Sequence, residues 1–469
     1  MEHEFIVAAR YIMLSGNPSK RRRTWPQGQA ALAIAAILGT LAAWAPAGDW
    51  PQWRGPHLNG STDETNLPVE FSKTENIAWM TPLPGGSGAT PIVIGERIFL
   101  VSAHRRTDDL IAMCISAADG KVLWEKTLSR GRLGDGRGET AGCSPVSDGK
   151  SVWFLFSSGL LAKTDLDGNI LWQRDLVKDY GCLAIKFGYS ASPLLHAGKL
   201  YLPLLRREKP YAYSPGADVP YTGDLVSLVL CHDAATGQKL WAQRRDTDAV
   251  DESRETYITP MPVEAAGRTE IVICGGQFVT AHDANSGKEL WRWEYTKKRE
   301  IWQRIVANPV VGFGLIFTCQ ANSQGVYALR PGGSGIIPHD KYAWAWDANG
   351  SDVCTPLLYG ENLYVLNGDK KVMTCLAART GKVKWSGQIE AKGPFRASPT
   401  GADGKIYCIS EGGDYIVLKA GDEFKELFRL STEAYPCRSS IVAANGSLYL
   451  RIFGMLICVR KAPAAAKDP

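Results

Sequence analysis

The chain has 469 residues, enough for one large repeat array or for two or three ordinary domains. Its apolar content of 45% and charged content of 22% are typical of a globular protein. The formal net charge is +5, of which residues 1–47, with five basic and two acidic side chains, supply +3. The remaining charge of about +2 argues against nucleic-acid binding driven by overall charge.

The first 47 residues carry the pattern of an export signal. Basic residues 20–23 precede an apolar run over 30–44, and small residues at 45–47 offer a cleavage site before Gly48. The run is shorter than the roughly 20 residues that span a bilayer. We predict a signal peptide over 1–47, with an uncleaved membrane anchor as the alternative, and a periplasmic or cell-surface location. The sequence leaves Met1 and Met13 both open as the start.

A Gly-x-x-x-Trp motif then recurs along the chain, at Gly120–Trp124, Gly168–Trp172, Gly237–Trp241, Gly287–Trp291 and Gly381–Trp385. Glycine accepts a positive φ, so each copy predicts a tight turn between two strands, with the tryptophan on the outer one. A large aromatic side chain there can cover a neighbouring sheet. We therefore predict sheet-docking roles for these five tryptophans and for Trp79, which lies in a similar strand at 76–83.

A second signature, a small residue followed by Ser, Thr or Asn and then Pro, opens each repeat. It occurs at Ala89–Pro91, Cys143–Pro145, Ala191–Pro193, Ile258–Pro260, Ala307–Pro309, Cys354–Pro356 and Ala397–Pro399, with a degenerate eighth copy at Arg438–Ser440. Proline is tolerated at the first residue of a strand. The spacing of about 48 residues matches a four-stranded propeller blade.

Both signatures predict an all-β, eight-bladed β-propeller of four-stranded antiparallel blades over residues 76–461. The last unit, 439–460, has three strands, so we expect the strand at about 76–83 to complete it and remove the exposed edges. Residues 48–75 form an N-terminal extension, and 462–469 are predicted to be a disordered tail.

The eleven cysteines of an exported protein would ordinarily suggest disulfides. The repeat predicts buried thiols instead for Cys114, Cys231, Cys375 and Cys458, because each occupies a small-residue packing position. Cys182 and Cys437 lie in loops and are the better disulfide candidates.

These repeats resemble the pyrroloquinoline-quinone (PQQ) type of propeller repeat across residues 76–461. The segment Asp49–Pro56, with sequence DWPQWRGP, resembles the opening motif of a bacterial subgroup common in planctomycetes. The resemblance implies a fold shared by the quinoprotein alcohol dehydrogenases and by BamB, the outer-membrane-assembly lipoprotein. It leaves the function open, because one branch is catalytic and the other binds proteins.

The sequence offers little support for a cofactor. Quinoprotein dehydrogenases place two adjacent cysteines against PQQ, whereas no two cysteines are adjacent here, and no Cys-x-x-Cys-His haem motif occurs. The seven histidines lack metal-ligand spacing. We predict neither cofactor nor metal, with PQQ and Ca²⁺ as the less favoured alternative.

The long insertions fall mainly on one face of the predicted disc, at the second-to-third turns and the blade-to-blade links; we call it the elaborated face. An exception, Pro331–Lys341, falls on the opposite, plain face. Function concentrates in such loops, so we place the binding site at the channel mouth of the elaborated face.

Residues just before the small-x-Pro signature are expected to point into this mouth. The candidate ligand-binding residues are Tyr189, Tyr257, Arg304, Asp352, Arg396 and Arg438, with Phe187, Trp302, Phe395 and Tyr435 nearby. Aromatic and guanidinium groups suit a sugar, a carboxylate or a peptide. The alternative role for each is to satisfy loop backbone and fill the mouth.

We predict a non-catalytic, monomeric binding module for a protein, peptide or glycan, with no nucleic-acid partner and membrane contact only through an uncleaved leader. The first alternative is a quinoprotein-like oxidoreductase acting on alcohols or polyols, with PQQ in the funnel. The second is a hydrolase or lyase with carboxylates from different blades. No catalytic residue stands out.

Overall fold

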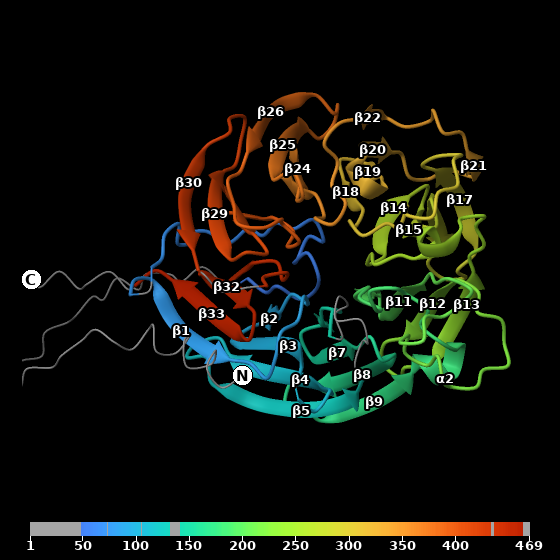
Figure 1. Ribbon diagram of the computed structural model, residues 1–469, viewed down its shortest axis with the longest axis horizontal. Coiled ribbons are helices and arrows are strands. Elements are labelled where there is room, and N and C mark those ends of the chain that lie inside the picture. The colour runs from blue at the N-terminus through green and yellow to red at the C-terminus, as the bar shows by residue number, and fades with distance from the viewer. Residues whose placement is uncertain (1–47, 73, 105, 132–140, 433–435, 463–469) are drawn as a thin grey trace, which may run out of the picture.

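The computed structural model describes residues 48–72, 74–104, 106–131, 141–432 and 436–462. The predicted leader, most of the predicted tail and Tyr435 lie outside them, so the predictions made there stay untested. Eight sheets, each with four antiparallel strands, surround a common axis, and a fifth strand adds to one of them (Figure 1). The predicted eight-bladed β-propeller is therefore confirmed.

The strands follow the repeat, and within each blade consecutive strands pair, the first lying nearest the axis. Blade 1 contains β2 (Ile92–Ile94), β3 (Arg97–Ala103), β4 (Asp109–Ser116) and β5 (Val122–Arg130); blade 2 contains β6 (Val146–Ser147), β7 (Ser151–Leu155), β8 (Leu160–Asp165) and β9 (Ile170–Asp175); blade 3 contains β10 (Leu194–His196), β11 (Lys199–Leu204), β12 (Leu228–Asp233) and β13 (Lys239–Arg244); blade 4 contains β14 (Met261–Ala265), β15 (Arg268–Gly275), β16 (Phe278–Asp283) and β17 (Glu289–Glu294).

The second half of the ring repeats the pattern. Blade 5 contains β18 (Val310–Gly312), β19 (Leu315–Cys319), β20 (Val326–Leu329) and β22 (Trp344–Trp346); blade 6 contains β23 (Leu357–Tyr359), β24 (Asn362–Asn367), β25 (Val372–Ala377) and β26 (Val383–Gln388); blade 7 contains β27 (Thr400–Ala402), β28 (Lys405–Ile409), β29 (Asp414–Lys419) and β30 (Glu426–Ser431); blade 8 contains β31 (Val442–Ala444), β32 (Ser447–Ile452), β33 (Met455–Arg460) and β1 (Ile77–Pro82).

Helical structure is confined to short segments of the described chain: α2 (Leu176–Tyr180), η1 (Asp251–Arg254) and η2 (Ala321–Ser323). Asp175 caps α2 by accepting hydrogen bonds from two backbone N–H groups of its first turn. Among the described helices, none has the length and apolar content needed to cross a bilayer.

The ring closes as the sequence predicts, between the two ends of the propeller. Strand β1 pairs antiparallel with β33, from Ile77 opposite Val459 to Pro82 opposite Met455. Figure 1 shows the two strands side by side, blue against red. The pairing gives blade 8 its fourth strand, which joins the chain ends and leaves no gap between blades 8 and 1.

The polar residue of the small-x-Pro signature forms a belt of hydrogen bonds around the axis. At seven blade junctions, its backbone N–H donates to the side-chain oxygen of the equivalent residue in the next blade, over 2.9–3.2 Å. The belt includes the degenerate eighth unit, where Ser440 donates to Thr90 and closes the circle. These buried N–H groups need a partner, which explains why Ser, Thr or Asn recurs at this position.

The Gly-x-x-x-Trp motif joins each blade to the next. The Trp79 indole lies on Gly120 of blade 1, where a Cβ atom would come within 2.6 Å of the ring, and its N–H donates to the Ala117 carbonyl. Gly120 has a φ of +74°, which suits the tight turn, and its lack of a Cβ atom leaves room for the indole. The other indoles of the motif lie at the same kind of junction, with Trp124 on Gly168, Trp172 on Gly237, Trp241 on Gly287 and Trp385 donating to the Gly421 carbonyl.

Blade 5 departs from this pattern. The connection between β20 and β22, residues 331–343, leaves its own blade, and its strand β21 (Gly335–Ile337) pairs parallel with β17 of blade 4. We call this connection the strap. It covers Trp291, whose N–H donates to the buried carboxylate of Glu270 and not to a turn of blade 5. Trp344, which the motif does not include, lies on Gly381 of blade 6.

The extension closes the plain-face end of the axis. Residues 50–62, which we call the plug, make backbone hydrogen bonds to inner-strand residues of four blades: Val93, Ser147, Leu358 and Gly401. Arg54 at its centre is 2% exposed and donates to the carbonyls of Pro356 and Pro399, over 3.0 and 2.9 Å. Burial lowers the pKa of Arg54 to about 9, so the guanidinium stays charged at neutral pH.

All eleven cysteines are buried, and none of them forms a disulfide within the described chain. Burial raises the pKa values of the Cys114, Cys231 and Cys375 thiols to about 12 and that of Cys458 to about 11, so these four are inert thiols in the core. Cys182 and Cys437, the two disulfide candidates, are also free, buried thiols, so the structure does not support a disulfide at either.

Candidate functional site

The links between blades 2 and 6 meet on the elaborated face in a cluster of charged and aromatic side chains. The cluster consists of Lys186, Glu252, Glu255, Tyr257, Arg304 and Asp352, and we call it the link cluster. Its members come from four successive blade-to-blade links, which makes it a joint between blades as well as a candidate site.

Glu252 is the electrostatic centre of the link cluster. Its side chain is 4% exposed and lies between two cations, Lys186 at 2.6 Å and Arg304 at 3.3 Å. Arg304 also contacts Asp352, with 3.2 Å between Nη2 and Oδ2. Such ion pairs offset the cost of removing a carboxylate from water.

Glu255 sits three residues further on and is held differently. Its Oε2 accepts hydrogen bonds from the Lys186 backbone N–H, over 2.8 Å, and from the Tyr257 hydroxyl, over 3.0 Å. Burial, reinforced by the charge of Glu252, raises the pKa of Glu255 to about 7, although these hydrogen bonds and Arg207 oppose the shift. Burial raises the pKa of Tyr257 as well, so its phenol remains protonated.

An aromatic platform covers the cluster. The Lys186 ammonium lies 4.5 Å from the ring of Trp302 and 5.4 Å from that of Phe187, which places a cation over two aromatic faces. Trp302 is 54% exposed, and its carbonyl accepts a hydrogen bond from the Asn322 side chain. Asn322 in turn donates its backbone N–H to Asp352. Asn322 therefore connects Trp302 of the platform to an ion pair of the link cluster.

The structure brings three of the six candidate residues together: Tyr257, Arg304 and Asp352 all belong to the link cluster. Arg396 and Arg438 lie apart from it on blades 6 and 7, where Arg396 pairs with Asp369 at 2.8 Å and Arg438 with Glu411 at 2.7 Å. Arg304, Arg396 and Arg438 therefore each form an ion pair with at least one carboxylate.

Tyr189 does not open onto the mouth. It is 1% exposed within the core of blades 2 and 3, and its hydroxyl has no hydrogen-bond partner among the described residues. Phe395 is likewise fully buried, in the core of blades 6 and 7. Proximity in sequence to the small-x-Pro signature did not by itself indicate whether a side chain points into the mouth.

Sequence reasoning missed Lys186, Glu252 and Glu255. The two glutamates lie in the link between β13 and β14 and Lys186 lies in the link between β9 and β10, and the sequence analysis placed such blade-to-blade links on the elaborated face. The local sequence did offer one signal, which is that two acidic residues lie three positions apart in the same loop. Their convergence with Lys186, almost 70 residues away, depends on neighbouring blades and leaves no local pattern.

The model of a family described as outer membrane protein assembly factor BamB matches residues 61–202, 222–336 and 337–425, which is more than half of the chain. The chain belongs to this BamB-type family of PQQ-repeat propellers. The planctomycete subgroup suggested by residues 49–60 stays a prediction.

A curated relative of this BamB-type propeller is a catalytic protein. Quinohemoprotein alcohol dehydrogenase ADH IIB of Pseudomonas putida is 25% identical over 197 residues, which cover 37% of this chain. The matched segment spans 25% of the length of that enzyme. The activity of the whole enzyme is therefore not carried over by this match.

Solved structures show the same fold in both functional branches. The quinohemoprotein alcohol dehydrogenase from Comamonas testosteroni matches with a TM-score of 0.67 and 11% identity, over 91% of this chain and 83% of that one. BamB from Moraxella catarrhalis matches with a TM-score of 0.53 and 12% identity, over 83% of this chain and 99% of that one. At these identities, the likeness concerns the fold alone.

The names of the dehydrogenases imply a PQQ cofactor, so the funnel residues can be tested against it. PQQ carries several carboxylates, which require cations, whereas Arg304, Arg396 and Arg438 already oppose carboxylates of this chain. No group of three or more His, Cys, Asp or Glu side chains converges as a metal site within the described residues. Within the described residues, these three arginines are therefore already paired with carboxylates of the chain itself.

Proposed function

We propose that this chain is a non-catalytic binding module that takes a protein, peptide or glycan ligand on the elaborated face, at the platform formed by Trp302, Phe187 and Lys186. The observation that carries the proposal is the exposure of Trp302, at 54%, above a buried ion-pair network. Exposed aromatic residues on a rigid base are typical anchors of binding interfaces.

The platform is held rigidly, which favours a binding surface over a catalytic site. Glu252, Arg304 and Asp352 have side-chain exposures of 4%, 18% and 13%, so their ion pairs are shielded from solvent and bridge neighbouring links. A ligand that stacks on Trp302 meets a surface already ordered, which lowers the entropy cost of association. Lys186 adds a positive charge at the edge of the stack.

The alternative function is a quinoprotein-like oxidoreductase, favoured by the match to an alcohol dehydrogenase over 197 residues. The paired arginines of the mouth weigh against it, as does the absence of adjacent cysteines from the sequence. Glu255, with a pKa of about 7, would suit general acid–base chemistry. It is 0% exposed, however, which favours a supporting role under the platform over contact with a substrate.

We further propose that the module acts outside the cytoplasm, as a monomer and without a nucleic-acid partner. The leader pattern of residues 1–47 supports export, and the family description refers to outer-membrane assembly. Membrane contact would then arise only through a leader that stays attached.

The binding proposal can be tested with arrays of immobilised glycans and of random peptides, probed with the purified protein. Removing an aromatic hot spot typically costs about 2 kcal/mol or more, so we expect Trp302→Ala to weaken binding of the ligands found roughly 30-fold or more. The measurement is the dissociation constant of each hit for both proteins.

Ile301→Ala is the matched control, because Ile301 is the adjacent residue and is also exposed, at 42%. It should leave the affinities nearly unchanged. Ligands that bind wild type and Trp302→Ala equally well would contradict the assignment of the platform, and arrays without any hit would contradict the binding function itself.

A further inference from the structure

A second candidate site lies on the plain face, where the strap departs from the repeat. In blades 1 and 3 the third and fourth strands are joined by tight turns, closed by the hydrogen bonds of Gly120 to Ser116 and of Gly237 to Asp233. In blade 5 the strap replaces this turn and joins blade 4 through β21. The surface beside the β18–β19 turn is therefore left without the cover that a tight turn gives.

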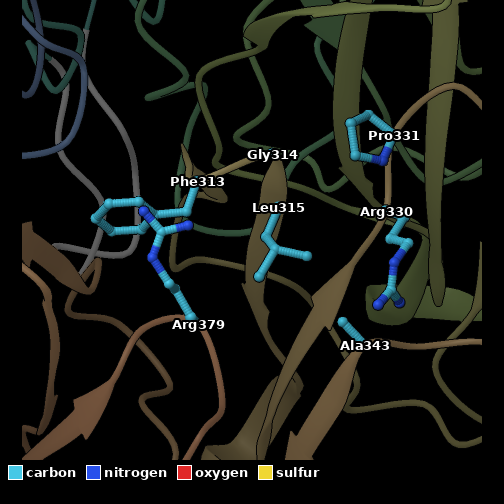
Figure 2. A pocket seen from close by; sticks show the side chains of 7 residues that line it. All are labelled: Phe313, Gly314, Leu315, Arg330, Pro331, Ala343 and Arg379. Atoms are coloured by element: carbon cyan, nitrogen blue, oxygen red, sulfur yellow. The ribbon is translucent and has the colours of Figure 1, made fainter.

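A hollow of about 440 Å³ occupies this place. Its walls come from the β18–β19 turn, the start and end of the strap and the β25–β26 turn of blade 6, and its lining residues are Phe313, Gly314, Leu315, Arg330, Pro331, Ala343 and Arg379. Figure 2 shows Phe313 and Arg379 on one side, Arg330 and Pro331 on the other, and Leu315 between them. The volume is within the range of small-molecule sites.

Arg330 forms the cationic end at the strap. It is exposed and has no ion-pair partner in the part of the chain that the structure describes. The neighbouring Pro331 leaves the backbone without an N–H donor at this end, so the guanidinium is the polar group available there. An arginine fork recognises a carboxylate with two parallel hydrogen bonds.

Arg379 forms the opposite cationic end and is held in place by stacking. Its guanidinium carbon lies 4.2 Å from the centroid of the Phe313 ring, a cation–π contact that favours this position of the side chain. Its contact with Glu361 is 3.4 Å long, and the two side chains are 60% and 70% exposed. Such an exposed pair is weak, so a ligand carboxylate can compete for this arginine.

The surface between the two arginines is apolar. Leu315 is 8% exposed, and Ala343 and the Phe313 ring add to the floor and wall. This arrangement would exclude a compact, strongly hydrated ion from the middle of the hollow, because the apolar floor offers no hydrogen bonds. It favours a molecule whose charges lie at its two ends.

We propose that this hollow binds a small organic dianion, a dicarboxylate with an apolar body, with one carboxylate on Arg330 and the other on Arg379. The site is distinct from the platform of the elaborated face and does not depend on the function proposed there. It adds a small-molecule ligand class to a propeller whose other face is proposed to bind a larger partner.

The test is calorimetric titration of the full mature chain with α,ω-dicarboxylates of four to ten carbons, each compared with the monocarboxylate of equal length. One additional partly exposed charge pair is worth about a three- to fivefold gain in affinity, so a dicarboxylate of matching length should exceed its monocarboxylate by at least that factor. Arg330→Gln and Arg379→Gln should each abolish this difference.

Two further variants test the same geometry. Glu361→Gln frees Arg379 and should tighten dicarboxylate binding about twofold to threefold, while Lys382→Gln, an exposed change in the same turn that lies outside the lining, should have no effect. Melting temperatures within about 2 °C of wild type would show that the arginine variants are folded. Equal affinity for mono- and dicarboxylates, or no heat signal at millimolar ligand, would overturn the proposal.

Discussion

Two glutamates three residues apart, Glu252 and Glu255, lie in different surroundings. Glu252 forms ion pairs with the Lys186 ammonium and the Arg304 guanidinium. Glu255 is held mainly by neutral donors, the Lys186 backbone N–H and the Tyr257 hydroxyl, and burial raises its pKa to about 7. The link cluster therefore carries a carboxyl that titrates near neutral pH.

This titration predicts a pH-dependent stability. The unfolded chain ionises Glu255 above about pH 4.5 while the folded chain holds the proton to about pH 7, so stability from this group is complete below pH 4.5 and is lost as the pH rises through 7. The loss should be of order 3 kcal/mol, because each pKa unit between the folded and unfolded values corresponds to about 1.4 kcal/mol. We expect Glu255→Gln to lack this decline in urea unfolding between pH 5 and 8.

The exposed Glu125→Gln serves as the control and should retain the wild-type profile. Parallel profiles for wild type and Glu255→Gln would mean that the carboxyl is ionised in the folded protein throughout this range. At the residue scale, then, periodicity identified Gly120 and its equivalents, because they recur in phase. It could not identify Glu255, whose raised pKa comes first from its burial, which the local sequence does not reveal.

At the scale of elements, the plug and the strap are the two departures from the repeat. The plug inserts Arg54 among backbone carbonyls of blades 6 and 7, and its Gly60 allows the guanidinium to approach where a Cβ atom would collide at 1.8 Å. The sequence placed the plug within an N-terminal extension over 48–75 and most of the strap in the insertion Pro331–Lys341. It did not predict their destinations, because each binds blades distant in sequence.

The contribution of the plug can be measured through Arg54. Arg54→Ala removes donors from the Pro356, Pro399 and Asn59 carbonyls and leaves a cavity, so the free energy of unfolding should fall by roughly 2–4 kcal/mol. Arg244→Ala, on an exposed outer strand, should cost less than about 0.5 kcal/mol. Equal denaturation midpoints for the two variants would show that the plug does not support the ring.

At the scale of the whole molecule, three interactions hold the ring: the pairing of β1 with β33, the polar belt and the indoles seated on neighbouring blades. The first and third were predictable, because two motifs recur with the same period and the last unit lacks a strand. The belt could be recognised only in the structure, because its hydrogen bonds join residues more than 40 positions apart. The side of the disc that carries the long loops was predictable from the sequence, and the link cluster among those loops was not.

Alcohol dehydrogenases and BamB share this propeller fold, so the fold does not indicate the function of this chain. The charges at the mouth are the more informative feature. Here Arg304, Arg396 and Arg438 oppose carboxylates of the chain itself. These ion pairs are the basis on which we propose a binding surface at the Trp302 platform in preference to a quinone site.

The most direct test of the proposed binding module is titration of the purified mature protein with PQQ and Ca²⁺, followed by absorbance and by dye-linked oxidation of a panel of alcohols. We predict no stoichiometric spectral change and no turnover above the rate of free PQQ. Uptake of one equivalent of PQQ together with alcohol-dependent dye reduction would contradict the account and establish an oxidoreductase.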